Sequence, residues 1–371
     1  MPPLTMMIKP VSGSCNMRCS YCFYMDEAQN REAPNRGRMS QELLETLVRR
    51  AFAYADGEVN FAFQGGEPTL AGEAFFTRLV ELQRKYNGRG LRVHNAVQTN
   101  GYDLPDGLID LFARERFLVG VSVDGDEALH DRFRRDAQGR GTYARVMENI
   151  GRLQAARVEY NVLCVVDEAV ARSGRRVFEA LAPHAFVQFI PCLDPLDGAK
   201  QAYSLTPEGY LQFLNETFDG YERAYFTGRY VSVRNFDNYI SILMGRQPES
   251  CAMRGRCETY YLIESDGDVY PCDFYALDEW KIGNVARDSF ARLEKSPVLR
   301  AFQEASYFVD PACRACRFYG LCRGGCRRER EPFVQGRPGL NRLCEAYKAF
   351  FEGALPRLER IARDVAQKER I

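Results

Sequence analysis

Three cysteines near the N-terminus, Cys15, Cys19 and Cys22, stand in one short segment of the chain. Three residues separate the first two cysteines and two residues separate the last two. Three thiolates on one loop can hold three corners of a cubane iron–sulfur cluster and leave the fourth iron without a protein ligand. An open metal position can bind and activate a small molecule, as in catalytic metal sites. A zinc loop is the alternative, although structural zinc usually needs four ligands and the next cysteine is Cys164.

A second set of cysteines lies in the C-terminal part of the chain. Eight thiols are enough to ligate two four-iron clusters completely, and the arginines among them would offset the charge of the thiolates. A pair of structural zinc sites is the alternative, because Cys-x-x-Cys loops often bind zinc. Cys164 lies within a predicted strand and Cys192 at the end of another. Both are expected to pack as small hydrophobic residues and not to bind metal. The eight are Cys251, Cys257, Cys272, Cys313, Cys316, Cys322, Cys326 and Cys344.

Strand-like and helix-like segments alternate between the two cysteine sets. A strand followed by a helix, repeated about six times, predicts parallel strands joined by right-handed crossovers. Six units are too few for a closed eight-fold barrel, so an open, partial α/β barrel is expected. We predict strands over residues 5–9, 59–63, 91–97, 117–123, 158–166 and 186–190. We predict helices over residues 41–52 with Ser40 as cap, 73–86, 108–114, 143–155, 169–181 and 207–226.

Short polar motifs follow the predicted strands, where active sites form in parallel barrels. After the second strand, two glycines let the backbone come close to a ligand, and Glu67 could accept hydrogen bonds from an ammonium group. After the fourth strand, Ser122 and Asp124 bring a hydroxyl and a carboxylate to one side, which suits ribose hydroxyls. A tight turn would explain the first motif equally well, and an ordinary Asp-Gly turn is the alternative for the second. The first motif is Gln64-Gly65-Gly66-Glu67-Pro68.

The cysteine segment, with Tyr21 just before its last cysteine, resembles the signature of the radical S-adenosylmethionine (SAM) enzymes. The resemblance implies that the open iron chelates SAM and that a 5′-deoxyadenosyl radical is released. It also implies the fold, a partial (β/α)6 radical SAM barrel. The methionine end of SAM would lie at the glycine motif, its ribose at Ser122 and Asp124, and its adenine at Leu193. The implied SAM residues are Tyr21, Gly65, Gly66, Glu67, Ser122, Asp124, Arg134 and Leu193, with Arg134 reaching the carboxylate.

The C-terminal cysteine spacing resembles the SPASM domain, which carries two auxiliary 4Fe–4S clusters. Gly267 lies in the turn of a predicted β-hairpin between the second and third of these cysteines. The resemblance implies three 4Fe–4S clusters in all and a barrel over residues 1–235. A small Cys-rich α+β SPASM domain with a closing helix would follow over residues 236–371. The implied ligand sets are Cys251, Cys257, Cys272 and Cys326 for one auxiliary cluster, and Cys313, Cys316, Cys322 and Cys344 for the other.

The segments at residues 61–68, 188–195 and 266–275 resemble the anaerobic sulfatase-maturating enzymes, and the resemblance runs essentially end to end. Those enzymes oxidise a Cys or Ser of a sulfatase to Cα-formylglycine without oxygen. By this resemblance Asp273 would be the general base, and Gln64 and Tyr24 would contact the peptide. The implied partners are a sulfatase polypeptide with a Cys/Ser-x-Pro/Ala-x-Arg motif and reduced flavodoxin or ferredoxin.

Composition narrows the possible partners. The formal net charge is zero and the isoelectric point is near 6.8, which argues against nucleic acid as a partner. The apolar run at the N-terminus is too short for a signal peptide and no stretch is long enough for a membrane span, so a cytoplasmic protein is expected.

One alternative is another SPASM enzyme that crosslinks or epimerises a ribosomal peptide. A leader-binding extension would favour it, but only seven residues precede Ile8. The second alternative is a non-catalytic zinc-binding scaffold or nucleic-acid module.

Overall fold

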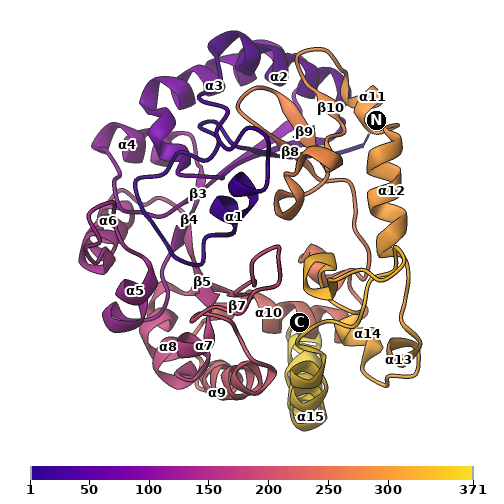
Figure 1. Cartoon of the computed structure of the whole chain (residues 1–371). Helices are drawn as coiled ribbons and strands as arrows, with labels where there is room; N and C mark the ends of the chain where they lie inside the picture. The colour runs from indigo at the N-terminus through magenta and orange to yellow at the C-terminus, as the bar shows by residue number, and fades with distance from the viewer. Residues whose placement is uncertain (1, 370–371) are drawn as a thin grey trace. The chain divides into compact units, whose positions relative to one another are not determined.

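The computed structural model, drawn in Figure 1, describes residues 2–369. Its internal contacts divide it into two compact units. Unit 1 comprises Met1–Val123, His130–Asn161 and Thr259–Phe302. Unit 2 comprises Asp124–Leu129, Val162–Glu258 and Gln303–Ile371. These units are defined by contacts within the chain, and the domain boundary after residue 235 stays a prediction.

Four parallel strands form the centre of unit 1. Ile8, Phe63, Val97 and Val119 are successive register partners across these strands, and all four are buried. Along β2 and at the end of β3, buried residues alternate with partly buried ones, so that one side of the strands faces the core. The strands are β1 (Leu4–Ile8), β2 (Glu58–Phe63), β3 (Arg92–Thr99) and β4 (Leu118–Ser122).

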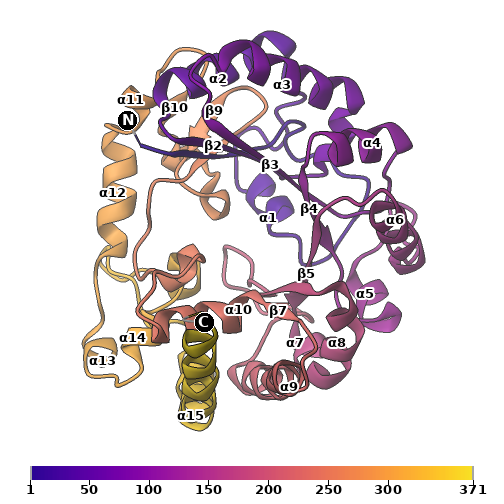
Figure 2. The same cartoon turned by 180° about the vertical axis from the view of Figure 1, so that it is seen from behind.

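Helices of unit 1 cover one face of this sheet. Figures 1 and 2 show α2, α3, α4 and α6 along that face, whereas α1 packs against the turn at Asp273–Tyr275. The Ser40 side chain accepts a hydrogen bond from the Leu43 N–H and caps α2, as predicted. The bounds are α1 (Phe23–Gln29), α2 (Gln41–Tyr54), α3 (Glu73–Tyr86), α4 (Asp106–Arg114) and α6 (Tyr143–Ala155), with α5 (Glu127–Phe133) shared between the units.

The predicted hairpin is present and extends the sheet of unit 1. Its strands β8 (Tyr261–Ile263) and β9 (Asp268–Tyr270) are antiparallel, and Gly267 in the turn has a φ of 88° that favours glycine. β8 pairs in parallel with β1, so that Ile263 lies opposite Ile8. The strand order in this unit is β10-β9-β8-β1-β2-β3-β4, where β10 is Gly283–Asn284. The unit also holds α11 (Phe290–Leu293) and most of α12 (Pro297–Ser306).

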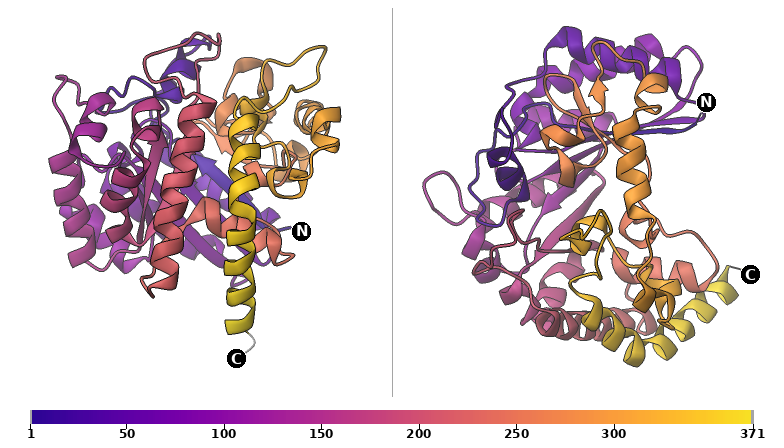
Figure 3. Two further views of the ribbon diagram at one scale, coloured as in Figure 1. Left: turned by 90° about the horizontal axis from the view of Figure 1, so that it is seen from below. Right: turned by 45° about the vertical axis from the view of Figure 1, so that its right-hand side comes forward.

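Unit 2 combines three parallel strands with the C-terminal helices. The long helix α9 packs against α8 and against α15, which is drawn in yellow in Figure 3. Phe218 of α9 meets Phe236 and Phe350, with ring centroids 5.1 and 5.6 Å away. The elements are β5 (Tyr160–Val166, of which residues 162–166 belong here), β6 (Phe186–Pro191), β7 (Ser232–Val233), α7 (Glu168–Ala171), α8 (Gly174–Leu181), α9 (Pro207–Phe226), α10 (Arg234–Leu243), α13 (Pro311–Arg314), α14 (Tyr319–Cys322) and α15 (Cys344–Lys368).

The single helix predicted over residues 169–181 is wrong, because the segment forms the two helices α7 and α8. Glu216 of α9 causes the interruption. Its carboxylate accepts a hydrogen bond from the Arg175 N–H at 2.9 Å, so it satisfies a donor that the first turn of a helix leaves free. Gly174 allows this close approach, since a Cβ there would lie 3.2 Å from the Phe213 Cα. Glu216 is remote in sequence and gives no local signal.

The residues that the structure describes include no helix long and apolar enough to cross a membrane.

Candidate active site

The loop that carries Cys15, Cys19 and Cys22 is held by backbone hydrogen bonds on both sides. On one side the N–H groups of Gly66 and Glu67 donate to the carbonyl oxygens of Ser12 and Ser14, at 3.0 and 2.7 Å. On the other side the Arg18 N–H donates to the Arg135 carbonyl at 2.7 Å. Main-chain hydrogen bonds from two directions therefore position the loop that carries the three cysteines.

Gly65 and Gly66 are needed for contacts within the protein. Gly65 has a φ of 117°, and a Cβ there would lie 2.6 Å from the Lys9 side chain. A Cβ on Gly66 would lie 2.0 Å from the Ser14 carbonyl oxygen. The two glycines thus allow the end of β2 to approach the start of the cysteine loop. Their predicted contact with SAM is a separate matter and stays a prediction.

We expect Gly66→Ala to destabilise unit 1, because the new methyl group overlaps the Ser14 carbonyl and the backbone must shift. Overpacking of this kind typically costs about 1–3 kcal/mol. Urea unfolding of the apoprotein measures the loss. Gly151→Ala is the matched control, because a Cβ at this position of α6 meets no atom from elsewhere in the chain within 4 Å. Ala favours a helix by about 1 kcal/mol over Gly, so this variant should not lose stability. Equal stability of Gly66→Ala and the unchanged protein would contradict the role of this contact.

The sulfur of Cys15 receives two N–H donors. The Met17 N–H lies 3.4 Å from the Cys15 Sγ, and the Asn100 side-chain amide lies 3.6 Å from it. Hydrogen bonds to sulfur are one of the means by which proteins tune iron–sulfur clusters. Burial raises the pKa of Cys15 to about 11, and a thiol that binds a metal must give up its proton. Three thiols on one loop with N–H groups aimed at sulfur fit a cubane cluster.

Among residues 2–369, no three His, Cys, Asp or Glu side chains are placed to hold one metal ion. A cubane needs a different arrangement, because each thiolate binds a different iron.

Next to the cysteine loop, Tyr24, Gln64 and Asp273 form one hydrogen-bonded group. The Gln64 Nε2 donates to the Tyr24 hydroxyl at 2.5 Å and to the Asp273 Oδ2 at 3.0 Å. Burial raises the pKa of Asp273, and hydrogen bonds from Cys272 and Gln64 act against that shift. The structure therefore brings together the predicted base and both predicted peptide contacts, although Gln64 and Asp273 are 209 residues apart in sequence.

Helix α1 connects the cysteine loop to the turn that carries Asp273. Its first residue follows Cys22 directly, and Phe23 meets Phe274 with ring centroids 4.8 Å apart. The Oε1 of Glu27, a buried residue of α1, accepts a hydrogen bond from the Ala276 N–H at 3.2 Å. Burial raises the pKa of Glu27 to about 8. Glu27 thus fixes the end of the Asp273–Tyr275 turn.

A buried ion cluster lies in the same region. Glu264 Oε1 is 2.7 Å from the Lys9 Nζ and 2.6 Å from the Arg31 Nη1, and all three side chains are fully buried. Burial alone would raise the pKa of Glu264, but Lys9 and Arg31 hold it at about 2. The Lys9 Nζ also lies 5.0 Å from the centre of the Tyr24 ring. No motif in the sequence marks Lys9, Glu27, Arg31 or Glu264, so their place in this site could not be predicted.

Glu67 is buried and already has four donors. Its Oε1 accepts hydrogen bonds from the N–H and hydroxyl of Thr69 and from the Thr99 hydroxyl, and its Oε2 accepts one from the Asn100 N–H. The carboxylate thus ties the end of β2 to the end of β3. Each carboxylate oxygen has two lone pairs, so only Oε2 keeps one for the predicted SAM ammonium.

The remaining predicted SAM residues are distributed over both units. In unit 1, the Ser122 Oγ accepts a hydrogen bond from the Gln98 Nε2 at 3.1 Å, and the Arg134 guanidinium lies over the Tyr21 ring, 5.5 Å from its centre. In unit 2, the buried Asp124 accepts a hydrogen bond from the Val165 N–H at 2.8 Å, and Leu193 follows β6. Their contacts with SAM stay predictions.

In unit 2 the C-terminal cysteines lie in two groups. The pKa of Cys326 is raised by burial and then by the neighbouring Glu329, Cys251 and Cys257. The pKa of Cys322 is raised to about 11 by burial and further by Cys344, Cys313 and Cys316. The cysteines among these neighbours are the members of the two predicted ligand sets apart from Cys272, which belongs to unit 1. The assignment of each cysteine to a cluster stays a prediction.

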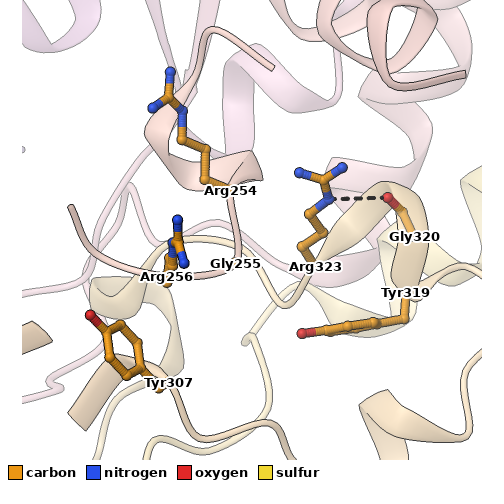
Figure 4. A pocket seen from close by; sticks show the side chains of 7 residues that line it. All are labelled: Arg254, Gly255, Arg256, Tyr307, Tyr319, Gly320 and Arg323. Carbon is orange, nitrogen blue, oxygen red and sulfur yellow. Dashed lines mark hydrogen bonds between the residues drawn. The ribbon is translucent and has the colours of Figure 1, made fainter. Parts of the chain in front are cut away.

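A shallow cationic pocket of about 400 Å³ lies on these cysteine-bearing segments. Figure 4 shows its three guanidinium groups and two tyrosine rings. Arg254 is paired with Glu258, and the Arg323 Nε donates to the Gly320 carbonyl at 3.3 Å. Arginines are therefore the charged side chains that line this pocket. Its lining residues are Arg254, Gly255, Arg256, Tyr307, Tyr319, Gly320 and Arg323.

Comparisons with known proteins agree with this geometry. The family model of the radical SAM superfamily matches residues 10–170, and that of an iron–sulfur cluster-binding (SPASM) domain matches residues 251–317. The chain is 43% identical to a cysteine-type anaerobic sulfatase-maturating enzyme of Clostridium novyi over the full length of both. It is 30% identical to a serine-type enzyme of Bacteroides thetaiotaomicron, covering 99% of this chain and 93% of the relative.

A solved structure described as native anSMEcpe with bound AdoMet and Cp18Cys peptide has a TM-score of 0.93 to this chain. The two are 40% identical, and the match covers 98% of this chain and all of the other. The partial α/β barrel of the radical SAM fold with a SPASM region is therefore confirmed. The chain belongs to the anaerobic sulfatase-maturating enzymes, the radical SAM oxidoreductases that convert a Cys or Ser of a sulfatase to Cα-formylglycine.

Proposed function

We propose that this chain oxidises the cysteine of a Cys-x-Pro-x-Arg motif in a sulfatase polypeptide, with Asp273 as the general base. The observation that supports it is the group formed by Tyr24, Gln64 and Asp273 beside the cysteine loop. The relatives with the higher identities, at 40–43%, are of the cysteine type, which favours cysteine over serine as the target.

The proposal includes SAM and three 4Fe–4S clusters, with Cys15, Cys19 and Cys22 as ligands of the first. When bound, these groups supply the deoxyadenosyl radical that removes a Cβ hydrogen and an acceptor for the electron that the substrate then loses. The two auxiliary ligand sets are those predicted from the sequence. Reduced flavodoxin or ferredoxin is the proposed electron donor.

The chain's own residues handle the proton and the geometry. Asp273 accepts the proton of the substrate thiol as the carbon–sulfur double bond forms, and hydrolysis of the thioaldehyde releases H₂S and leaves the aldehyde. Gln64 orients Asp273 by donating a hydrogen bond to its Oδ2. The same amide nitrogen donates to the Tyr24 hydroxyl. A base must lie within hydrogen-bond reach of the proton that it takes. Glu27 accepts a hydrogen bond from the Ala276 N–H and so helps to hold the turn that carries Asp273.

The direct test is anaerobic incubation of the reconstituted protein with SAM, a reductant and a short synthetic peptide that contains Cys-x-Pro-x-Arg. We expect mass spectrometry to find the aldehyde on the cysteine peptide, and a slower reaction on the same peptide with Ser. A peptide with Ala at the target position is the control and should give no aldehyde. A thioether crosslink or an epimerised residue in place of the aldehyde would favour a peptide-modifying SPASM enzyme instead.

A further inference from the structure

The loop Cys192-Leu193-Asp194 at the end of β6 carries the proposed adenine contact, Leu193. The Cys192 N–H donates to the Val166 carbonyl at 3.0 Å and so continues the pairing of β6 with β5. The Asp194 carboxylate accepts hydrogen bonds from the Ser204 hydroxyl and the Lys200 ammonium, each at 2.6 Å. These contacts join the loop to the neighbouring strand β5 and to residues that follow it closely in sequence.

Two arginines from the cysteine-rich C-terminal segment hold the same loop. The Arg342 Nη2 donates to the Cys192 carbonyl, and the Arg328 Nη2 donates to the Asp194 carbonyl at 2.9 Å. The Arg342 Nη1 also lies 4.0 Å from the Asp194 carboxylate. The side chains of Arg328 and Arg342 are only 10% and 20% exposed. The carbonyl groups on both sides of Leu193 are therefore fixed by guanidinium groups from elsewhere in the sequence.

The segments that carry the two arginines are bonded to each other. The Arg342 N–H donates to the Glu329 carbonyl at 2.9 Å, and the Asn341 amide donates to the Glu329 carboxylate at 3.0 Å. Each arginine also stands two residues from a proposed cluster ligand, Arg328 after Cys326 and Arg342 before Cys344. These cysteines belong to the two different auxiliary sets, so both segments would become ordered as their clusters bind.

We propose that Arg328 and Arg342 are positioning residues for SAM, which fix the backbone around Leu193 and couple the cysteine-rich segment to SAM affinity. The inference rests on the proposed function, which includes SAM, and on the adenine contact predicted at Leu193. A guanidinium that bonds to a carbonyl is a charge-assisted donor, stronger than a neutral one. Loss of either bond leaves Leu193 free to take other positions, and the adenine must then order the loop on binding. Because coupling between two sites is reciprocal, SAM must in turn stabilise the segment at residues 326–344.

The first experiment compares SAM affinity among reconstituted holoenzymes by equilibrium dialysis without reductant, so that no turnover occurs. We expect Arg328→Ala and Arg342→Ala to bind SAM about tenfold more weakly, with iron content unchanged. Arg342→Lys should recover part of the affinity, because an ammonium can still donate to the Cys192 carbonyl. Arg172→Ala is the control: it removes an exposed guanidinium that pairs with Glu168 on α7 and should bind SAM normally. Normal SAM affinity in both Ala variants with full iron content would overturn the proposal.

The second experiment uses the unchanged holoenzyme and does not depend on the folding of any variant. Hydrogen–deuterium exchange is measured with and without SAM, and the amides of residues 326–344 should exchange more slowly with SAM. Identical exchange rates in that segment would overturn the proposal. Neither measurement involves the peptide. A failure of formylglycine formation would therefore reject the proposed function, while the SAM affinities and exchange rates would still test the role of Arg328 and Arg342.

Discussion

Asp273→Asn is expected to lower formylglycine formation by about 10²–10⁴, the usual contribution of a general base, while SAM is still cleaved. Asparagine keeps the size of the side chain and an oxygen that can accept the Gln64 hydrogen bond, but it cannot take the thiol proton. Removal of the Cβ hydrogen does not need the base. Deoxyadenosine should therefore accumulate in excess over the aldehyde, and chromatography and mass spectrometry of one reaction mixture measure both products.

Glu279→Gln is the matched control for Asp273→Asn. It removes an exposed carboxylate in the next turn of the chain and should leave the ratio of deoxyadenosine to aldehyde unchanged. A near-normal aldehyde yield from Asp273→Asn would leave Asp273 as a structural neighbour of Cys272. A loss of SAM cleavage together with aldehyde would mean that the substitution damages the cluster site, and it would also count against the role of base.

Replacing Cys15, Cys19 and Cys22 together by Ala is expected to abolish SAM cleavage and to remove about one third of the bound iron, since three cubanes would hold about twelve irons. The other clusters depend on cysteines in other parts of the chain, so their iron should stay. Iron analysis and deoxyadenosine formation under anaerobic conditions measure the two effects.

Cys164→Ala is the control for the triple substitution. Cys164 is fully buried in β5, and its removal should change neither the iron content nor SAM cleavage. Zinc in place of iron in anaerobic preparations, or SAM cleavage that survives the triple substitution, would reject the cluster assignment.

Local sequence signals predicted the elements that depend on local contacts. The helices α3, α6 and α9 have the predicted bounds, and Ser40 caps α2 by a bond to an N–H three residues ahead. The prediction over residues 169–181 failed because a carboxylate on α9 bonds to the Arg175 N–H. The short helix α1 was not predicted, since its stability depends on contacts such as that of Phe23 with Phe274 more than on its own length.

The sequence by itself determined the chemistry of the donor groups: three thiols at fixed spacing, eight more in the C-terminal part, and a hairpin turn at Gly267. These features are local, because a loop's ligand set and a turn's φ angle depend on residues close together in the chain. Only the tertiary structure decided that Gln64 joins Tyr24 to Asp273 and that Arg328 and Arg342 hold the loop around Leu193. Such contacts join residues separated by 40 to 209 positions. Which loops meet depends on how strands and helices pack, and periodicity within one segment carries no information about its distant neighbours.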